Sequence, residues 1–277
     1  MFKRLELLLI AVCLFLTVGI VIDGQRKNSI AATAEFERVS DSALTALQSR
    51  MNLYLQSLNG AAGMMQTSEN TEYDDFETYV QSLSIETYLP GINGIGFIEP
   101  VAADRLDEVV NKMRADGVSD FRVHPITDND VKYIIKYIAP VGPNQQAVGL
   151  DISFEKGRRD AAERARETGL PQLTPRILLV QDATKQPGFL LLRPLYQESG
   201  SEKGDFAGWV YAPFVGRNLL QGLTPDQHRT FDFQVYDGTV ADPETLIYAS
   251  DEANEHIMGA YLRQYTVEFF GRPWTIH

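Results

Sequence analysis

Residues that carry chemistry are scarce in this sequence. The single cysteine, Cys13, lies in an apolar N-terminal run, so no disulfide bond can form within the chain. The four histidines are widely separated and form no H-x-x-x-H pair, which argues against a zinc site: His124, His228, His256 and His277. The G-x-S-x-G pattern of a serine nucleophile is also absent. We therefore expect that this chain is not an enzyme and holds no metal or cofactor.

Basic residues are few relative to acidic ones. Lysine and arginine number 25 against 37 aspartate and glutamate residues, which gives a formal net charge of −12 and a pI near 4.8. A body this acidic repels the phosphates of nucleic acids, so we predict no nucleic-acid partner. The length of 277 residues and the hydrophobic share of 44% suit one large domain or two small ones.

Charge is absent from one long segment near the N-terminus. The 16 residues from Leu7 to Ile22 carry none, and as a helix they would span roughly 24 Å. A bilayer core requires roughly 20 residues, and snorkelling by Lys3 and Arg4 would make up the difference. A cleaved signal peptide is the alternative, but no small-x-small cleavage site follows. We predict that residues 1–23 form a cytoplasmic tip and a transmembrane anchor in the cell inner membrane, with the remainder periplasmic or extracellular.

A long stalk helix is predicted next, over residues 24–72. Within it, apolar residues recur at alternating steps of three and four: Leu44, Leu47, Met51, Tyr54, Leu58, Ala61 and Met65. Two interpretations fit this stripe. It is the seam of a homodimer through Leu44, Leu47, Met51, Tyr54 and Leu58, or it is the face by which one helix packs on its own domain. In both cases the helix links the domain to the membrane.

Strand and helix patterns alternate along the rest of the chain. Apolar runs bounded by turn residues predict strands in "PGINGIGFIEPV", "YIIKYIAPV", "PRILLVQD", "FLLLRPLY" and "FAGWVYAPF", and capped segments predict helices at 74–82 and 155–168. This order predicts an α+β domain of the PAS type at residues 73–220. After a linking helix, three more strands predict a smaller, membrane-proximal sheet at residues 221–277.

The segment "GRRDAAERARETG", residues 157–169, combines arginines with alanines. On a helix, Arg158, Ala161, Ala162 and Ala165 share one face, and the alanines let that face approach a sheet closely. One interpretation is a plain amphipathic helix with surface salt bridges. The other is that Arg158 enters a cavity between helix and sheet, where a guanidinium favours a carboxylate or phosphate ligand.

This segment and its flanks resemble the CHASE domain, the extracellular sensor of cytokinin receptors and of many bacterial histidine kinases, diguanylate cyclases and adenylate cyclases. The resemblance rests on "GLDIS", "GRRDAAERARETGLPQLTPRILLVQ" and "GFLLLRPLY", with support from "PGINGIGFIEPV", "YIIKYIAPV" and "FFGRPWTIH". It implies a stalk helix, two PAS-like subdomains with antiparallel sheets, and a ligand pocket in the membrane-distal one. It also implies a second membrane helix and a cytoplasmic output enzyme beyond His277.

The resemblance further implies which residues face the ligand. In cytokinin receptors an aspartate early in this helix holds the adenine ring, and Arg158 stands at that position here. One threonine of the family is kept as Thr174, while Leu192 replaces another. A cation that only donates hydrogen bonds thus replaces a carboxylate that only accepts them. We expect a small-molecule ligand that is acidic and is not cytokinin, bound by Ile152, Arg158, Thr174, Leu179, Leu192 and Arg193.

Together these features predict an extracytoplasmic small-molecule sensor module of a transmembrane signalling receptor. Its output domain, a histidine kinase or nucleotide cyclase, is not part of this chain. The alternative is a ligand-free PAS-like module for dimerisation or partner interaction. Bulky side chains at Ile152, Leu179 and Leu192 that fill the cavity would favour this alternative.

Overall fold

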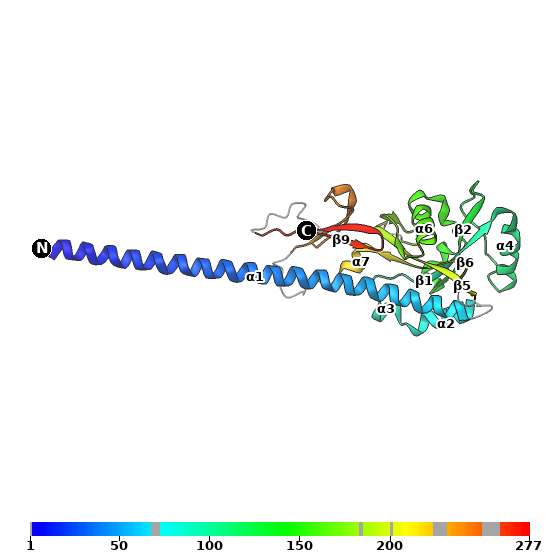
Figure 1. Ribbon diagram of the computed structural model, residues 1–277, viewed down its shortest axis with the longest axis horizontal. Helices are drawn as coiled ribbons and strands as arrows, with labels where there is room; N and C mark the ends of the chain where they lie inside the picture. The colour runs from blue at the N-terminus through cyan, green and yellow to red at the C-terminus, as the bar shows by residue number, and fades with distance from the viewer. Residues whose placement is uncertain (1, 68–72, 183–184, 200–201, 224–231, 251–260) are drawn as a thin grey trace.

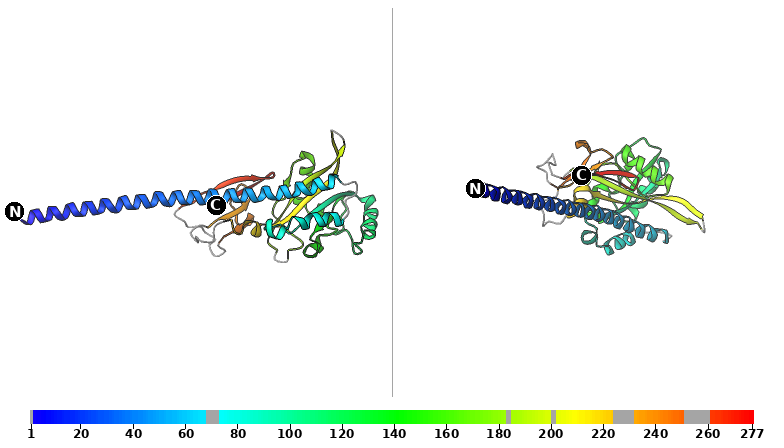
Figure 2. Two further views of the ribbon diagram at one scale, coloured as in Figure 1. Left: turned by 90° about the horizontal axis from the view of Figure 1, so that it is seen from below. Right: turned by 60° about the vertical axis from the view of Figure 1, so that its left-hand side comes forward.

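The computed structural model describes residues 2–67, 73–182, 185–199, 202–223, 232–250 and 261–277, with side chains from Cys13 onward except at 198–199 and 202–203. One helix, α1 (Phe2–Thr67), runs along the body and extends beyond it at the N-terminal end (Figure 1, Figure 2). Two antiparallel sheets lie along the C-terminal part of this helix. The α+β prediction, with a long N-terminal helix and antiparallel sheets, is confirmed.

The first sheet has the strand order β2-β1-β6-β5-β3, and β4 also pairs with β5. Its strands are β1 (Ile95–Ala102), β2 (Val131–Ala139), β3 (Gln172–Leu173), β4 (Ile177–Leu178), β5 (Pro187–Ser199) and β6 (Glu202–Val215). The helices and 3-10 turns around it are α2 (Tyr73–Ser82), α3 (Ile85–Tyr88), η1 (Ala103–Arg105), α4 (Leu106–Ala115), α5 (Val141–Asn144), η2 (Gln145–Ala147), η3 (Ile152–Phe154) and α6 (Lys156–Thr168).

The glycine-rich run "PGINGIGFIEPV" forms β1, and one of its glycines allows a close approach. A Cβ atom on Gly96 would lie 2.4 Å from the ring of Tyr211, which projects from the neighbouring strand β6. Any larger residue at this position would displace that ring. The strand predicted in this run is confirmed, and it packs closely on its neighbour.

Both faces of the first sheet are covered. Helices α1 and α2 pack on one face and α6 packs on the other (Figure 1). Strand β5 illustrates the alternation of side chains, because Phe189 and Leu191 pack with α1 while Leu190 and Leu192 pack with α6. The sheet is thus a shared wall between two apolar clusters.

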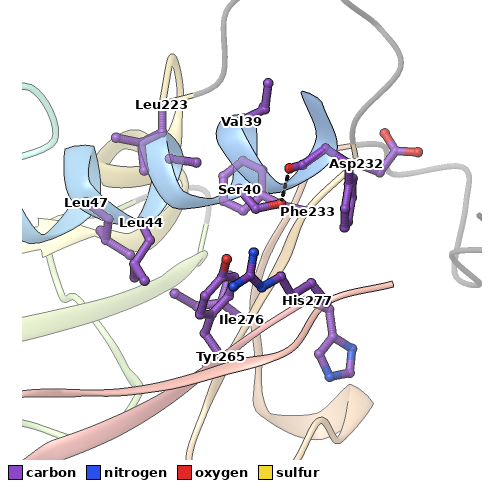
Figure 3. Close-up of a pocket in the computed structure, with 13 residues that line it drawn as sticks. Val39, Ser40, Leu44, Leu47, Leu223, Asp232, Phe233, Tyr265, Ile276 and His277 are labelled. Carbon is purple, nitrogen blue, oxygen red and sulfur yellow. Dashed lines mark hydrogen bonds between the residues drawn. The ribbon is translucent and has the colours of Figure 1, made fainter. Parts of the chain in front are cut away.

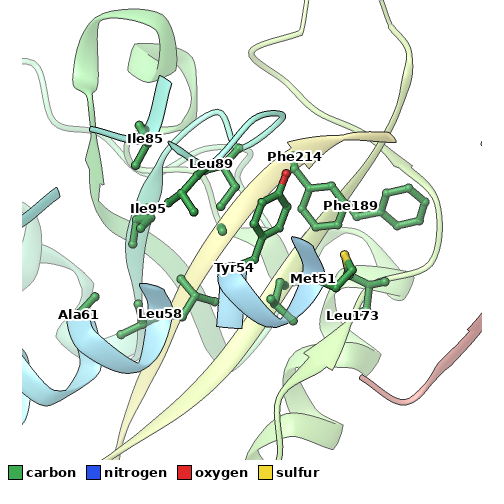
Figure 4. Packing of buried hydrophobic residues seen from close by; sticks show 14 of the residues in the cluster. Met51, Tyr54, Leu58, Ala61, Ile85, Leu89, Ile95, Leu173, Phe189 and Phe214 are labelled. Carbon is green, nitrogen blue, oxygen red and sulfur yellow. The ribbon is translucent and has the colours of Figure 1, made fainter. Parts of the chain in front are cut away.

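The apolar stripe of α1 packs on the chain's own sheets. Leu47, Met51, Tyr54 and Leu58 are each at most 2% exposed and belong to the apolar cluster between α1 and the strands (Figure 4). Leu44 is half-buried against the same cluster. The prediction of a homodimer seam through these residues is wrong because the chain itself covers them, and the intrachain interpretation is confirmed. Whether the chain forms a homodimer at all stays a prediction.

Polar contacts fix the position of α1 along the first sheet. Near the middle of the buried stretch, the Tyr54 hydroxyl donates a hydrogen bond to the Pro90 carbonyl. At the C-terminal end of the helix, Nε2 of Gln66 donates to the Tyr196 carbonyl at 2.9 Å. The buried part of α1 is therefore held both by apolar packing and by directional bonds.

The predicted membrane anchor is not confirmed. Among the residues that the structure describes, no helix combines the length and the hydropathy needed to cross a bilayer. The side chains of residues 2–12, which include the start of the predicted span, lie outside the described part of the chain.

The second sheet has the strand order β8-β7-β10-β9. Its elements are β7 (Gln234–Asp237), η4 (Pro243–Thr245), β8 (Leu246–Ala249), β9 (Tyr265–Phe269) and β10 (Arg272–Ile276), and α7 (Gly216–Leu220) precedes them. Four strands stand where three were predicted, because the closing run turns at Phe270 and Gly271, both with positive φ. The division of the chain at residue 220 stays a prediction.

Candidate functional site

Helix α6 begins and ends at capping residues. Oε1 of Glu155 accepts a hydrogen bond from the Gly157 amide at 2.9 Å, so Glu155 is the N-cap of the helix. The sequence predicts Glu155 as the first helical residue, and the helix instead begins at Lys156. Gly169 ends the helix with a φ of 70°, and its amide donates to the Ala165 carbonyl at 2.9 Å. The cap uses one carboxylate oxygen of Glu155 and leaves the second oxygen for other contacts.

Small residues allow α6 to lie directly on the sheet. Ala161, Ala162 and Ala165 are buried, and their methyl groups face strands β5 and β6. Nε1 of Trp209, on β6, donates a hydrogen bond to the Ala162 carbonyl at 2.9 Å. This bond joins the middle of the helix to the middle of the sheet and fixes the height of α6 above it.

Arg158 points into the interface between α6 and the sheet. Its side chain is only 4% exposed, so the interpretation of α6 as a helix with an entirely solvated charged face is wrong at this position. One terminal nitrogen, Nη2, donates to the Leu178 carbonyl at 2.6 Å, and the Phe154 ring lies 5.4 Å from the guanidinium carbon. Burial lowers the pKa of Arg158, against the opposing effects of Glu155 and Tyr211. The guanidinium keeps its charge because its ordinary pKa is so high.

Three buried polar atoms around Arg158 have no hydrogen-bond partner. They are Nε of Arg158, Oε2 of Glu155 and the hydroxyl of Tyr211, and none finds a partner within the part of the chain that the structure describes. Nε and Oε2 face each other at 3.4 Å, which is an ion pair without hydrogen-bond geometry. Burial raises the pKa of the Tyr211 hydroxyl, while Arg158 opposes the rise, so the hydroxyl is protonated at neutral pH. Unpaired buried polar groups cost free energy, and so they mark a place where a ligand is favoured.

Four other predicted ligand residues lie near Arg158. Ile152, Leu179 and Leu192 belong to one apolar cluster with the alanines of α6. Thr174 is fully buried, and its Oγ1 accepts a hydrogen bond from the Leu190 amide at 2.9 Å. The apolar side chains fill space between helix and sheet, as the ligand-free alternative expects, whereas the unpaired polar atoms are what a ligand site requires.

The sixth predicted residue, Arg193, lies on the opposite face of the sheet. Its Nε donates to Oδ1 of Asn59, on α1, at 2.6 Å. Neighbouring residues of a strand point to opposite faces, so Leu192 and Arg193 cannot both face α6. The structure therefore does not bring Arg193 together with the other five.

A buried carboxylate supports the start of α6. Asp151 is fully buried, and its Oδ1 accepts hydrogen bonds from the Tyr133 amide at 2.9 Å and from the Ser153 hydroxyl at 2.6 Å. Its Oδ2 accepts from the Thr127 hydroxyl at 2.8 Å, and Lys132 in turn donates to Thr127. The run containing Thr127 is thus tied into the network. Within the described residues no group of histidine, cysteine and acidic side chains is arranged to hold a metal ion.

A family model decides the identity of the chain. The model described as the CHASE domain matches residues 69–248, which is well over half of the sequence. The chain belongs to the CHASE domain family. The matched region contains the whole first sheet, helix α6 and every residue of the site beneath it. Membership of this family supports a ligand-binding sensor module. No curated protein sequence matches the chain.

Solved structures resemble this CHASE domain only distantly. The ligand-binding domain of the Pseudomonas aeruginosa PAO1 amino acid chemoreceptor PctC, in complex with GABA, is 10% identical, with a TM-score of 0.46 over 86% of this chain and 96% of that one. A methyl-accepting chemotaxis protein X is 11% identical, with a TM-score of 0.41 over 85% and 95%. The sensory domain of the Campylobacter jejuni chemoreceptor Tlp3 (CcmL), with isoleucine bound, is 9% identical, with a TM-score of 0.41 over 87% and 91%.

A small pocket lies elsewhere in the CHASE chain, between α1 and the second sheet (Figure 3). Its volume is about 60 Å³, and Val39, Leu44 and Leu47 of α1 face Phe233, which precedes β7, and Ile276 of β10 across it. None of the predicted ligand residues lines this pocket. It is therefore separate from the site beneath α6.

The segment that follows α6 joins this site to the second sheet. The Leu173 amide donates to the Phe270 carbonyl at 2.9 Å, at the turn between β9 and β10. The Arg176 amide donates to Oδ2 of Asp237, on β7, at 2.9 Å. Asp237 is held in turn by a bidentate pair with Arg272 at 2.6 and 2.7 Å. Residues 172–176 therefore contact both sheets.

Proposed function

We propose that this CHASE domain is the extracytoplasmic small-molecule sensor of a transmembrane signalling receptor and binds its ligand beneath α6. The observation that carries the proposal is the set of three buried, unpaired polar atoms on Glu155, Arg158 and Tyr211. A bound ligand would satisfy them at once. The ligand-free alternative leaves the Tyr211 hydroxyl buried without a partner, at a cost of roughly 1–3 kcal/mol, and leaves Nε of Arg158 and Oε2 of Glu155 in an ion pair that lacks a hydrogen bond.

The chemistry of these atoms specifies the ligand. Nε of Arg158 and the Tyr211 hydroxyl offer hydrogen bonds to an acceptor, which favours an acidic group. Oε2 of Glu155 needs a donor. We therefore propose a small acid that also carries an N–H or O–H donor. A purine of the cytokinin type does not meet this requirement, because it lacks an anion for Arg158.

Membrane attachment forms part of the same proposal. Leu14, Phe15, Leu16, Ile20 and Ile22 of α1 are each at least 59% exposed. Apolar side chains in such a row favour a lipid environment. An output enzyme, a histidine kinase or nucleotide cyclase, would receive the signal on the other side of the membrane.

Tyr211→Phe tests the ligand site with little risk to the fold, because the hydroxyl that it removes makes no hydrogen bond in the protein. We expect the variant to be as stable as the wild type without ligand. Thermal-shift screening of the full chain against hydroxy, amino and keto acids should yield a ligand, since saturation at about 100 times Kd adds roughly 2.7 kcal/mol of stability. That ligand should bind about tenfold or more weakly to Tyr211→Phe and to Arg158→Met.

Arg164→Met is the matched control, because Arg164 lies on the same helix and is exposed. It should bind the ligand as the wild type does. A ligand whose affinity is unchanged in both Tyr211→Phe and Arg158→Met would refute the site. Silence across the panel in a stably folded chain would favour the ligand-free module.

A further inference from the structure

A large cleft opens on the other face of the first sheet, away from α6. Its volume is about 900 Å³, and it is bounded by the end of α1, the start of α2, α4 and strands β1, β2, β5 and β6. The apolar part of its wall, including Phe97, Met113, Tyr137 and Leu195, belongs to the cluster that packs with α1. None of the residues of the α6 site lines it. The cleft is thus a separate place for a ligand.

A β-bulge in strand β2 directs a lysine into this cleft. Phe97 of β1 pairs with Tyr137, and the next residue, Ile98, pairs with Ile135, so Lys136 has no partner across the ladder. A bulge of this kind redirects a side chain from the regular alternation, and Lys136 and Tyr137 both line the cleft. The Lys136 ammonium lies 5.3 Å from the centre of the Tyr137 ring.

Lys136 forms an ion pair with Glu99 inside the cleft. Nζ lies 2.8 Å from Oε2, and the two side chains are 14% and 25% exposed. The comparable pair Arg105–Glu108, on the surface of the same domain, is 64% and 69% exposed. Burial is the largest single effect and works to lower the pKa of Lys136, but Glu99 and Tyr137 together outweigh it and the net shift is upward. The Lys136 ammonium is therefore charged at neutral pH, and both side chains of the pair are only partly hydrated.

The charges around the cleft balance. Three acidic and three basic residues line it: Asp74, Glu99, Asp116, Arg105, Lys112 and Lys136. A net-neutral wall attracts neither a simple anion nor a simple cation over long range. The site thus offers an ammonium and a carboxylate close to aromatic rings.

We infer that this cleft binds a small zwitterion of the α-amino acid class. The ligand carboxylate would pair with Lys136, the ligand ammonium would pair with Glu99, and an apolar side chain would lie against Phe97 and Tyr137. Each charge of the partly desolvated ion pair thereby gains a second partner of opposite sign. A ligand with only one charge would pair with one member and repel the other.

The test measures binding to the full chain by calorimetry. The probes are the common L-amino acids, and for the amino acid that binds best, its two halves. For leucine these are isocaproate, which keeps the acid, and isoamylamine, which keeps the amine. We expect the zwitterion to bind and neither half to bind at comparable concentration. Glu99→Gln, which conserves shape, should weaken binding about tenfold or more, equivalent to about 1.4 kcal/mol. Lys136→Met should do the same.

Two controls locate the binding. Asp160→Asn removes a carboxylate from the exposed pair Lys156–Asp160, neither of which lines the cleft, and should leave the affinity unchanged. Tyr211→Phe alters the α6 site alone and should also leave it unchanged. Loss of binding in Tyr211→Phe but not in Glu99→Gln would place the zwitterion beneath α6, which overturns this inference and leaves the proposed function intact. Equal binding of the acid or the amine alone, or no binding by any amino acid at millimolar concentration, would also overturn it.

Discussion

Leu58→Ala tests whether α1 packs within one chain. Leu58 is fully buried between α1 and the first sheet, in the cluster that also holds Tyr54 and Ile95 (Figure 4). Truncating a buried leucine to alanine costs roughly 2.7–5 kcal/mol, since the transfer energy is lost and a cavity remains. We expect Leu58→Ala to lower the free energy of unfolding by an amount in this range, because neighbours from both helix and sheet surround Leu58 and prevent the cavity from closing.

The two tryptophans make the assay informative about both sheets. Trp209 lies in the first sheet and Trp274 in the second, and both are fully buried. Their fluorescence during equilibrium urea unfolding of the full chain should show a lower unfolding midpoint for Leu58→Ala than for the wild type. Leu53→Ala is the matched control, because Leu53 lies on the same helix and is 42% exposed. We expect it to change stability by less than about 0.5 kcal/mol.

Protein concentration separates the intrachain packing from a dimer seam. If the stripe packs within the chain, the unfolding midpoint is the same at every concentration. If it were a seam between two chains, the midpoint would rise with concentration, and Leu58→Ala would shift the oligomeric state. A concentration-dependent midpoint, or a loss below about 1 kcal/mol in Leu58→Ala, would refute the reasoning.

Two further predictions concern charge. Burial, with a smaller effect of Glu163, raises the pKa of Tyr133 to about 12, so its contribution to stability is complete below pH 10 and is lost as pH rises through 12. Tyr133→Phe should therefore lose about 1.4 kcal/mol less than the wild type between pH 8 and pH 11 in urea titrations, and equal losses would contradict this. Asp237→Asn leaves Arg272 without its carboxylate. Removing one partner of a buried ion pair costs roughly 3–5 kcal/mol, and we expect a loss near the lower end of this range because the Arg272 side chain is 29% exposed. The exposed-pair variant Glu108→Gln should differ from the wild type by less than about 0.5 kcal/mol, and a similar loss in both variants would count against a special role for Asp237.

Local rules of the backbone made the elements of this chain predictable. The alanine spacing and Gly169 placed α6 to within one residue, because helix periodicity and a left-handed C-cap are properties of neighbouring residues. The stripe on α1 was equally clear, but its partner was not. A helix that packs on a sheet and a helix that packs on a copy of itself both need apolar residues at steps of three and four, so the same spacing fits both.

The site was harder to predict because its members come from distant segments. Arg158 was predicted from its face of the helix and from the family resemblance, and Thr174 from the resemblance alone. Tyr211 enters through the pairing of β6 with β5, which no local pattern reveals. Glu155 was predicted to be the first residue of the helix, and only the structure shows it to be the N-cap, with one carboxylate oxygen bonded to the Gly157 amide. Arg193 could have been set aside from the sequence alone, since it follows Leu192 directly in a strand.

The arrangement of contacts implies how a ligand beneath α6 would affect the rest of the molecule. Residues 172–176 follow α6 directly, and they bond to the second sheet through Leu173 and Phe270 and through Arg176 and Asp237. The long helix α1, by contrast, is held on the first sheet by its own polar contacts and apolar stripe. A displacement of α6 is therefore transmitted to the second sheet more directly than to α1. Because a ligand shifts an equilibrium only by its difference in affinity for two arrangements, the arrangements that matter are those that differ in the position of the second sheet along α1.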